Sequence, residues 1–284
     1  MTALDETWAK MPCTWQTDAR VHAVIRSTPC GEAIAALKLY IAFCLKANYK
    51  AKEELPAPGC VRASLTQLCT LIRTSRPMVV EGLRHLESWG LINKLGGRPA
   101  VYQLCNYENP KYWTKLPKFY LFGDRYKRRE VKAITALPNR EAATVDALQM
   151  YLYLASVRDK NTHKATVTYD KMQQVLKLGR NQISHGISTL TGHELITARR
   201  EGDLTKLPSN VYWLRGTYAD PVTRAERSGQ AANDFSAVVD VDADIGQPSP
   251  TSAESAPIGS AMARDPAWAK GLLKRLMAGT ADQD

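Results

Sequence analysis

The sequence contains two copies of one pattern, and this internal repeat constrains the fold more than any other feature. The segment from Ser64 to Ile92 aligns without a gap on the segment from Thr168 to Ile196. Shorter matches occur in the same order in both halves: Trp8-Ala-Lys-Met-Pro12 with Trp113-Thr-Lys-Leu-Pro117, Ala36-Leu-Lys-Leu-Tyr40 with Ala147-Leu-Gln-Met-Tyr151, and Val101-Tyr-Gln-Leu104 with Val211-Tyr-Trp-Leu214. A shared order of matches along two segments of similar length predicts two structural units of the same kind.

Each copy begins with the pattern of an apolar helix. Apolar residues that recur every three or four places fall on one face of a helix. This stripe consists of Ile34, Leu37, Ile41, Cys44 and Leu45 in the first copy, and of Val145, Leu148, Tyr151, Leu152 and Ala155 in the second. We therefore expect a helix with one buried face, followed in each copy by a variable loop.

Two shorter helices and a hairpin are expected after this loop. A hydroxyl residue, Ser64 or Thr168, stands where an N-cap of the second helix is needed. The buried face of the third helix follows the spacing i, i+4, i+7, with Val79, Leu83 and Leu86 in the first copy and Ile183, Ile187 and Leu190 in the second. Alternating residues then predict a two-stranded hairpin. The expected fold class is mainly α with small β-hairpins (α+β).

This order of elements is that of a winged helix-turn-helix domain. The first copy resembles that superfamily in one sequence motif. The motif consists of Ser64, Leu65, Ser75, Arg76, Val79, Leu83, Leu86, Trp89, Gly90, Leu91 and Ile92. The resemblance implies two winged helix-turn-helix domains in tandem, each with a third helix that lies in the major groove of DNA.

A second resemblance concerns the segment before the second helical array. Trp113-Thr-Lys-Leu-Pro-Lys118, followed by a basic stretch and a winged helix, is similar to the N-terminal DNA-binding module of plasmid replication initiators. The likeness covers roughly residues 113–196. The first copy departs from this motif, because Cys13 stands where the lysine after the proline would be.

These observations divide the chain into four expected parts. Residues 1–108 form a first winged-helix domain with an N-terminal extension, and residues 109–218 form a basic connector with a second one. Residues 219–264 are rich in Ala, Asp, Ser, Pro and Gly and are expected to form a disordered linker. Residues 265–284 are expected to form a short amphipathic helix. Its apolar face, Trp268, Leu272, Leu273 and Leu276, would either dock a partner protein or fold back onto the body.

The distribution of charge favours a polyanionic partner. The net formal charge of the chain is +10. Residues 1–220 hold 32 basic and 19 acidic residues, a net charge of +13, whereas residues 221–284 hold 6 basic and 9 acidic residues, a net charge of −3. A basic body indicates nucleic acid as the commonest partner of this kind. The sequence has no long apolar stretch and no signal-peptide pattern, so a cytoplasmic location without membrane contact is expected.

The expected DNA contacts fall into three groups. The third helices would read base edges, since Arg pairs with guanine and Asn or Gln with adenine. Their outward residues are Ser75, Arg76, Met78 and Arg84 in the first copy, and Arg180, Asn181, Gln182, Ser184 and His185 in the second. The hairpin tips would add Arg98 in the first copy and Arg199, Arg200 and Lys206 in the second. The connector would contact phosphates through Arg125, Lys127, Arg128 and Arg129. Its Trp113 is expected to pack against a neighbouring element, with base stacking as the alternative.

The functional hypothesis follows from these assignments. We expect a non-enzymatic, sequence-specific double-stranded DNA-binding protein of a plasmid or mobile element, acting as an origin-binding replication initiator. A winged-helix transcription regulator and a protein–protein interaction module are the alternatives. The six cysteines have no Cys-x-x-Cys spacing, and neither a cofactor nor a metal is expected. The chain would bind as a monomer or as a homodimer, with Trp8, Trp15 and residues 21–25 as a candidate dimer contact.

Overall fold

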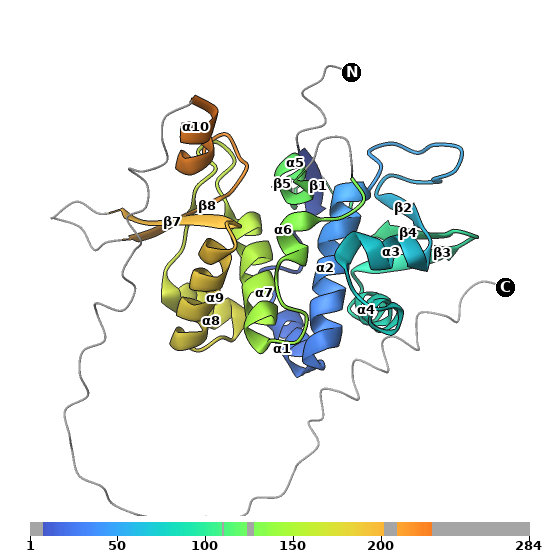
Figure 1. Ribbon diagram of the computed structural model, residues 1–284, viewed down its shortest axis with the longest axis horizontal. Helices are drawn as coiled ribbons and strands as arrows, with labels where there is room; N and C mark the ends of the chain where they lie inside the picture. The colour runs from blue at the N-terminus through green and yellow to red at the C-terminus, as the bar shows by residue number, and fades with distance from the viewer. Residues whose placement is uncertain (1–7, 110, 124–127, 202–208, 229–284) are drawn as a thin grey trace, which may run out of the picture. The chain divides into compact units, whose positions relative to one another are not determined.

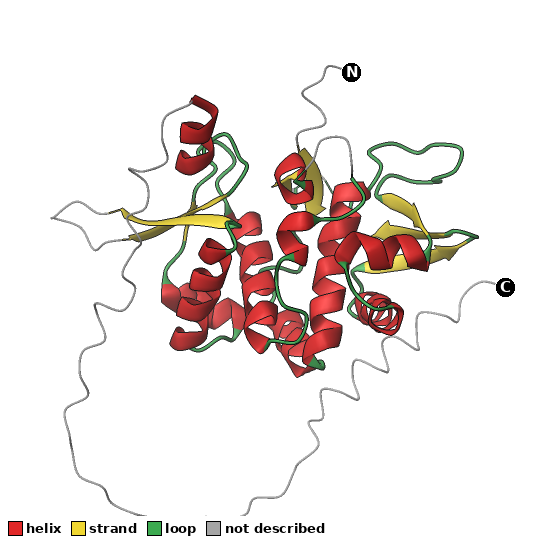
Figure 2. Cartoon of the chain, viewed as in Figure 1, coloured by secondary structure: helices red, strands yellow, loops and turns green. Residues whose placement is uncertain are grey.

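The chain forms helices accompanied by small sheets, arranged around two long central helices. The computed structural model describes residues 8–109, 111–123, 128–201 and 209–228. Within these residues, ten helices accompany one two-stranded and two three-stranded antiparallel sheets. Figure 2 shows how small the strands are beside the helices. The expected combination of helices with small antiparallel sheets is thus confirmed.

The same order of elements occurs twice along the chain. In the first copy it is α2 (Cys30–Lys46), β2 (Cys60–Ala63), α3 (Leu65–Ile72), α4 (Arg76–Ser88), β3 (Ile92–Gly96) and β4 (Ala100–Leu104). In the second copy it is α7 (Ala142–Val157), β6 (Ala165–Thr166), α8 (Tyr169–Leu176), α9 (Arg180–Gly192), β7 (Ile196–Glu201) and β8 (Ser209–Leu214). Val79 and Ile183, at equivalent positions of α4 and α9, are both fully buried. The repeat in the sequence is therefore a repeat of local structure.

Each copy carries a three-stranded sheet where the sequence predicted only a hairpin. The strand orders are β2-β4-β3 and β6-β8-β7, so the added strand of each sheet comes from the loop after the first helix. Cys60 pairs with Gln103 in one sheet, and Ala165 pairs with Tyr212 in the other. These added strands have only four and two residues, too few for a recognisable alternation.

The turn between the second and third helices has matching geometry in the two copies. The side-chain oxygen of Ser64 accepts from the backbone N–H of Gln67, and that of Thr168 accepts from Lys171. Each helix then ends at a left-handed residue, Arg73 with φ 47° and Lys177 with φ 58°. The predicted caps are confirmed, and both tight turns carry a basic residue at the same point.

The two central helices are buried on every side. Residues 33–45 of α2 and residues 144–155 of α7 are all buried. The predicted apolar stripe of each helix is buried. The other faces, for which the sequence made no such prediction, are buried too, because each helix packs both against its own copy and against the other central helix. Figure 1 shows α2 and α7 side by side, with the two copies on either side of them. The described residues 8–228 belong to one compact unit. The predicted domain boundaries stay predictions.

A two-stranded ribbon joins the beginnings of the two copies. Strand β1 (Trp8–Pro12) pairs antiparallel with β5 (Trp113–Pro117). The indoles of Trp8 and Trp113 stack with centroids 5.7 Å apart, so the expectation that Trp113 packs is confirmed. Trp15 and Ile25 are buried inside the chain, which excludes them from the suggested dimer contact. Ile25 belongs to helix α1 (Ala19–Ser27), which contacts α8.

Short helices connect and close these units. Helices α5 (Lys118–Phe122) and α6 (Lys132–Thr135) lie in the connector between the copies. Helix α10 (Pro221–Ser228) follows the last strand, although the sequence predicted a linker from residue 219 onwards. That prediction is wrong for residues 221–228, and the rest of the predicted linker lies outside the described residues.

Two equivalent glycines allow the third helix of each copy to cross its central helix closely. A Cβ on Gly82 would lie 2.9 Å from the backbone nitrogen of Ala36 and 3.0 Å from the carbonyl carbon of Ala35. A Cβ on Gly186 would instead lie 2.5 Å from Sδ of Met150. Backbone cannot give way without moving the helix, whereas a methionine side chain adapts readily.

We expect Gly82→Ala to destabilise the protein by about 1–3 kcal/mol through overpacking. Gly186→Ala should cost clearly less, since Met150 can move and alanine favours a helix over glycine by about 1 kcal/mol. Urea denaturation of both variants measures the difference. Equal losses in the two variants would contradict the backbone contact at Gly82.

The centre of α2 holds a lysine that is completely buried. Nζ of Lys38 donates to the carbonyl oxygen of Leu137 and to Oδ1 of Asn139, each at 2.7 Å. Burial lowers the pKa of this ammonium group from 10.5 to about 8, because the charged form loses its hydration. The folded chain therefore binds its proton here less tightly than the unfolded chain does.

We expect the free energy of unfolding to rise as the pH increases from about 8 towards 10.5, the two pKa values of Lys38 in the folded and unfolded chain. In this window the unfolded chain binds more protons at residue 38, so a higher pH favours the folded state. Lys38→Gln, which copies the residue at the equivalent position 149, should flatten this rise. Urea denaturation across the window compares the two proteins, and an identical pH dependence would count against the assignment.

Candidate nucleic-acid interface

The N-terminal turns of α4 and α9 expose basic and polar side chains at equivalent positions. Arg76 and Arg180 are the first residues of the two helices, and both are exposed. Ser75 and Asn181 beside them are exposed as well. The guanidinium of Arg180 lies 5.5 Å from the ring centroid of Tyr169, which holds its stem against α8. These four residues can reach a ligand without any rearrangement of the fold.

Two other predicted readers of α4 are differently placed. Met78 is half-buried, with its sulfur beside Gly31 at the start of α2, so it packs the helix onto its neighbour. Arg84 is exposed, and its guanidinium forms an ion pair at 2.5 Å with Glu81 one turn earlier. An exposed pair of this kind is worth less than about 1 kcal/mol, so Arg84 can exchange it for another anion.

Gln182 of α9 is already bound at both ends of its side chain. Oε1 accepts from the backbone N–H of Gly179 at 2.9 Å, and Nε2 donates to Oδ2 of Asp146 at 3.2 Å. Arg26 of α1 occupies the other oxygen of Asp146 at 2.7 Å. The expectation that Gln182 reads adenine is therefore not supported by its position, because its amide closes the helix start and links α9 to α7. The spacing of three residues between Gly179 and Gln182 resembles that of a capping box. This spacing was the sequence signal that could have indicated the capping role of Gln182.

The remaining predicted readers of α9 differ in exposure. His185 is exposed and Ser184 is half-buried. At the hairpin tips, Arg98 and Arg200 are exposed, while Arg199 is half-buried. Gly96 and Gly97 have φ values of 93° and 90°, so the turn that presents Arg98 requires glycine. Lys206 lies outside the described residues.

The basic connector is described only in part. The guanidinium of Arg128 lies 5.3 Å from the ring centroid of Phe119, and Arg129 is exposed. Arg125 and Lys127 lie outside the described residues. The predicted docking residues of the terminal helix also lie outside them, namely Trp268, Leu272, Leu273 and Leu276.

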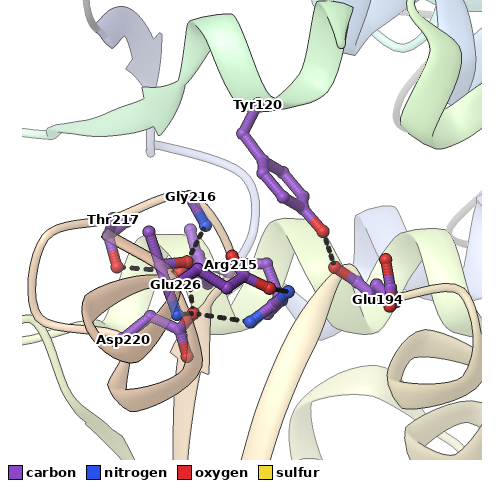
Figure 3. Close-up of polar contacts among 9 residues, drawn as sticks. Tyr120, Glu194, Arg215, Gly216, Thr217, Asp220 and Glu226 are labelled. Carbon is purple, nitrogen blue, oxygen red and sulfur yellow. Dashed lines mark hydrogen bonds and ion pairs between the residues drawn. The ribbon is translucent and has the colours of Figure 1, made fainter. Parts of the chain in front are cut away.

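A buried ionic cluster behind the second hairpin was not predicted from the sequence (Figure 3). Asp220 is fully buried and accepts from Arg215 at 3.3 Å and from the backbone N–H of Thr223 at 2.9 Å. Arg215 also donates to Glu226 of α10 at 2.7 Å. Nearby, the hydroxyl of Tyr120 donates to the carbonyl oxygen of Glu194 at 2.5 Å. These contacts hold α10 and the connector against the second copy. In the sequence, the pair Asp220-Pro221 was the signal that could have indicated the start of α10.

One group of side chains offers three potential metal ligands within the described part of the chain. Ligand atoms of Glu32, Glu81 and His85 lie within 4.8 Å of one another, and all three residues are half-buried. Nε2 of His85 lies 2.6 Å from Oε2 of Glu32. Glu81 already pairs with Arg84, and the contact between His85 and Glu32 ties α4 to the start of α2.

Comparison with models of protein families, with curated proteins and with solved structures gives no match for this chain. Among the described residues, no helix combines the length and the apolar character that crossing a membrane requires.

The placement of Gln182 gives a matched pair of variants on one helix turn. We expect Gln182→Ala to lower the free energy of unfolding by about 1 kcal/mol, because two hydrogen bonds at the start of α9 are lost. Asn181→Ala, at the exposed neighbouring position, should change it by less than about 0.5 kcal/mol. Thermal or urea denaturation distinguishes them, and a neutral Gln182→Ala would refute the capping role.

Proposed function

We propose that this chain is a sequence-specific double-stranded DNA-binding protein with two winged helix-turn-helix units in tandem. In this proposal α4 and α9 are the recognition helices, and the β3–β4 and β7–β8 hairpins are the wings. The order of elements supports the assignment, since each unit has a helix, a helix-turn-helix and a closing antiparallel hairpin.

The single observation that carries the proposal is the equivalence of Arg76 and Arg180. Both are exposed first residues of the third helix of their copy. Residues near the N-terminus of a recognition helix reach base edges, and Arg binds guanine through two hydrogen bonds. Met78 of α4 lies beside Gly31 near the start of α2, and Gln182 of α9 bonds Asp146 near the start of α7. The proposal is supported by this common position of α4 and α9 at the same end of the central helix pair.

The charge of the chain supports the same ligand. The net formal charge is +10, and basic residues in an exposed interface release counterions from DNA. Arg73 and Lys177 add a basic residue to each helix-turn-helix at the same left-handed position. Phosphate contacts of this kind position a protein on duplex DNA, whereas the helix residues supply the sequence preference.

The biological role in this proposal is origin binding as a replication initiator of a plasmid or mobile element. Its support is the likeness of residues 113–196 to the DNA-binding module of such initiators, which begins with the Trp-x-Lys-Leu-Pro motif. Sites clustered as repeats at an origin would support this role. A single site that overlaps a promoter would instead indicate a transcription regulator.

We expect fluorescence anisotropy to show duplex binding that weakens steeply with salt, because phosphate contacts release counterions. Arg76→Ala and Arg180→Ala should each weaken binding to a selected site by about 1–3 kcal/mol. Lys50→Ala is the matched control, since Lys50 is exposed just beyond the opposite end of α2. Absence of duplex binding at low salt would exclude the proposed function.

A further inference from the structure

Three side chains with metal-ligand chemistry converge where α4 packs against the start of α2. Glu81 and His85 stand four residues apart on α4, and this spacing places both on the same face of the helix. Glu32 lies in the first turn of α2. One ligand atom from each of the three residues lies within 4.8 Å of the other two. The expectation that no metal is bound rested on cysteine spacing, which does not concern these residues.

Packing fixes the positions from which these side chains extend. Gly82 separates the two α4 ligands at the closest approach to α2, where its Cβ would lie 2.9 Å from the backbone nitrogen of Ala36. The ring of His85 stacks on that of Trp89, with centroids 5.6 Å apart. Its Nε2 atom lies 2.6 Å from Oε2 of Glu32. A ligand set that is held in place in this way loses little conformational entropy when it binds an ion.

The group gathers more negative charge than its contacts satisfy. Glu32 and Glu81 place carboxylate oxygens within 4.8 Å of each other, and like charges at this separation repel. Oε2 of Glu81 is buried, and no donor in the described residues makes a hydrogen bond to it. The exposed guanidinium of Arg84 lies 2.5 Å away as an ion pair only. A divalent cation between the carboxylates would neutralise both and give the buried oxygen a ligand bond.

The separations of the ligand atoms suit a small transition-metal ion. A tetrahedral zinc ion with bonds of about 2.0–2.1 Å holds its ligand atoms about 3.3 Å apart. One pair here lies at 2.6 Å and the other separations are at most 4.8 Å, so side-chain shifts on the order of 1 Å would reach that geometry. An imidazole nitrogen beside carboxylates favours Zn²⁺ over Mg²⁺ and Ca²⁺, which prefer oxygen ligands alone.

We propose that Glu32, Glu81 and His85 form a binding site for one Zn²⁺ ion that links α2 to α4. Three protein ligands leave the fourth position of a tetrahedral ion to a water molecule. Zinc binding displaces Arg84 from Glu81, so the metal ion and this guanidinium compete for one carboxylate. The inference is independent of the proposed function, because it concerns the folded chain without DNA.

The second copy of the repeat carries one of these three ligand types. Its equivalent positions hold His185, Thr189 and Ala143. Threonine and alanine side chains are not zinc ligands, so the equivalent crossing of α9 and α7 lacks the set. One ion per chain is therefore expected at this pair of helices.

The affinity of the full chain for Zn²⁺ tests the site. The chain is freed of metal with a chelator, and Zn²⁺ is then titrated in competition with a chromogenic chelator. We expect one ion per chain and a rise in melting temperature, since an ion that binds the folded state stabilises it. Mg²⁺ at the same concentration should produce neither effect. Absence of zinc binding, or equal binding of Mg²⁺, would overturn the inference.

Variants of single ligands place the ion. His85→Gln and Glu81→Gln should each weaken zinc binding by roughly tenfold or more, because each removes one of three ligands. The matched controls are His193→Gln, at a half-buried histidine after α9, and Glu87→Gln, at an exposed position of α4. These controls should leave zinc binding unchanged. Unaltered binding in the ligand variants, or equal losses in the controls, would show that the ion is held elsewhere and would overturn the inference.

Arg84→Ala provides a prediction of the opposite sign. This variant removes no ligand and frees Glu81, so zinc binding should tighten by about twofold to fivefold, the contribution of an exposed ion pair. It decides the matter even if circular dichroism shows that the ligand variants are unfolded. Unchanged or weaker binding in Arg84→Ala would contradict the shared carboxylate and overturn the inference. None of these measurements involves DNA, so such a result would leave the proposed function intact.

Discussion

The packing of α2 against α7 is the constraint on which the rest of the structure depends. Each of these helices is buried on all sides, so neither copy has a complete core without the other. Burial of apolar surface contributes about 25 cal/mol per Å², and a helix that is apolar all round loses this contribution when half of it faces water. The two copies therefore form one compact unit in the described residues.

Polar groups at this central contact make the packing specific. Lys38 and Gln149 are fully buried, and each hydrogen-bonds a backbone carbonyl across the boundary between the copies. A buried polar group without a partner costs about 1–3 kcal/mol, so a shifted register of the two helices is disfavoured. These hydrogen bonds therefore act mainly by destabilising shifted registers of α2 and α7. Their contribution to the stability of the observed register is smaller. Arg26 and Asp146 add an ion pair between α1 and α7.

This shared core gives the proposed DNA interface its geometry. The close crossings at Gly82 and Gly186 set α4 on α2 and α9 on α7. The fixed arrangement of α2 and α7 then fixes the position of α4 relative to α9. Two binding elements that are held in place before binding avoid the ordering cost that a free linker would add.

Local structure could be predicted from the sequence alone. The repeat, the caps Ser64 and Thr168, the buried positions Val79 and Ile183, and the exposed Arg76 and Arg180 depend on neighbours within one copy, and local patterns report such neighbours. The strands β2 and β6, the helix α10 and the engagement of Gln182 by Asp146 could not be predicted from local pattern, although short signals for the last two were present. The two strands and the bond of Gln182 depend on partners 36 or more residues away in the sequence, whereas α10 is held by Arg215 and Asp220 shortly before it.

The sequence by itself thus determined that two units of one kind exist and which core positions, such as Val79 and Ile183, each unit buries. Only the tertiary structure decided how the two units meet, because the pairing of β1 with β5 and of α2 with α7 joins segments about a hundred residues apart. Hydrophobic periodicity shows which face of a helix is buried. It does not show which other helix or strand packs against that face. That physical limit is why the contact between the two copies appeared only when the chain was folded.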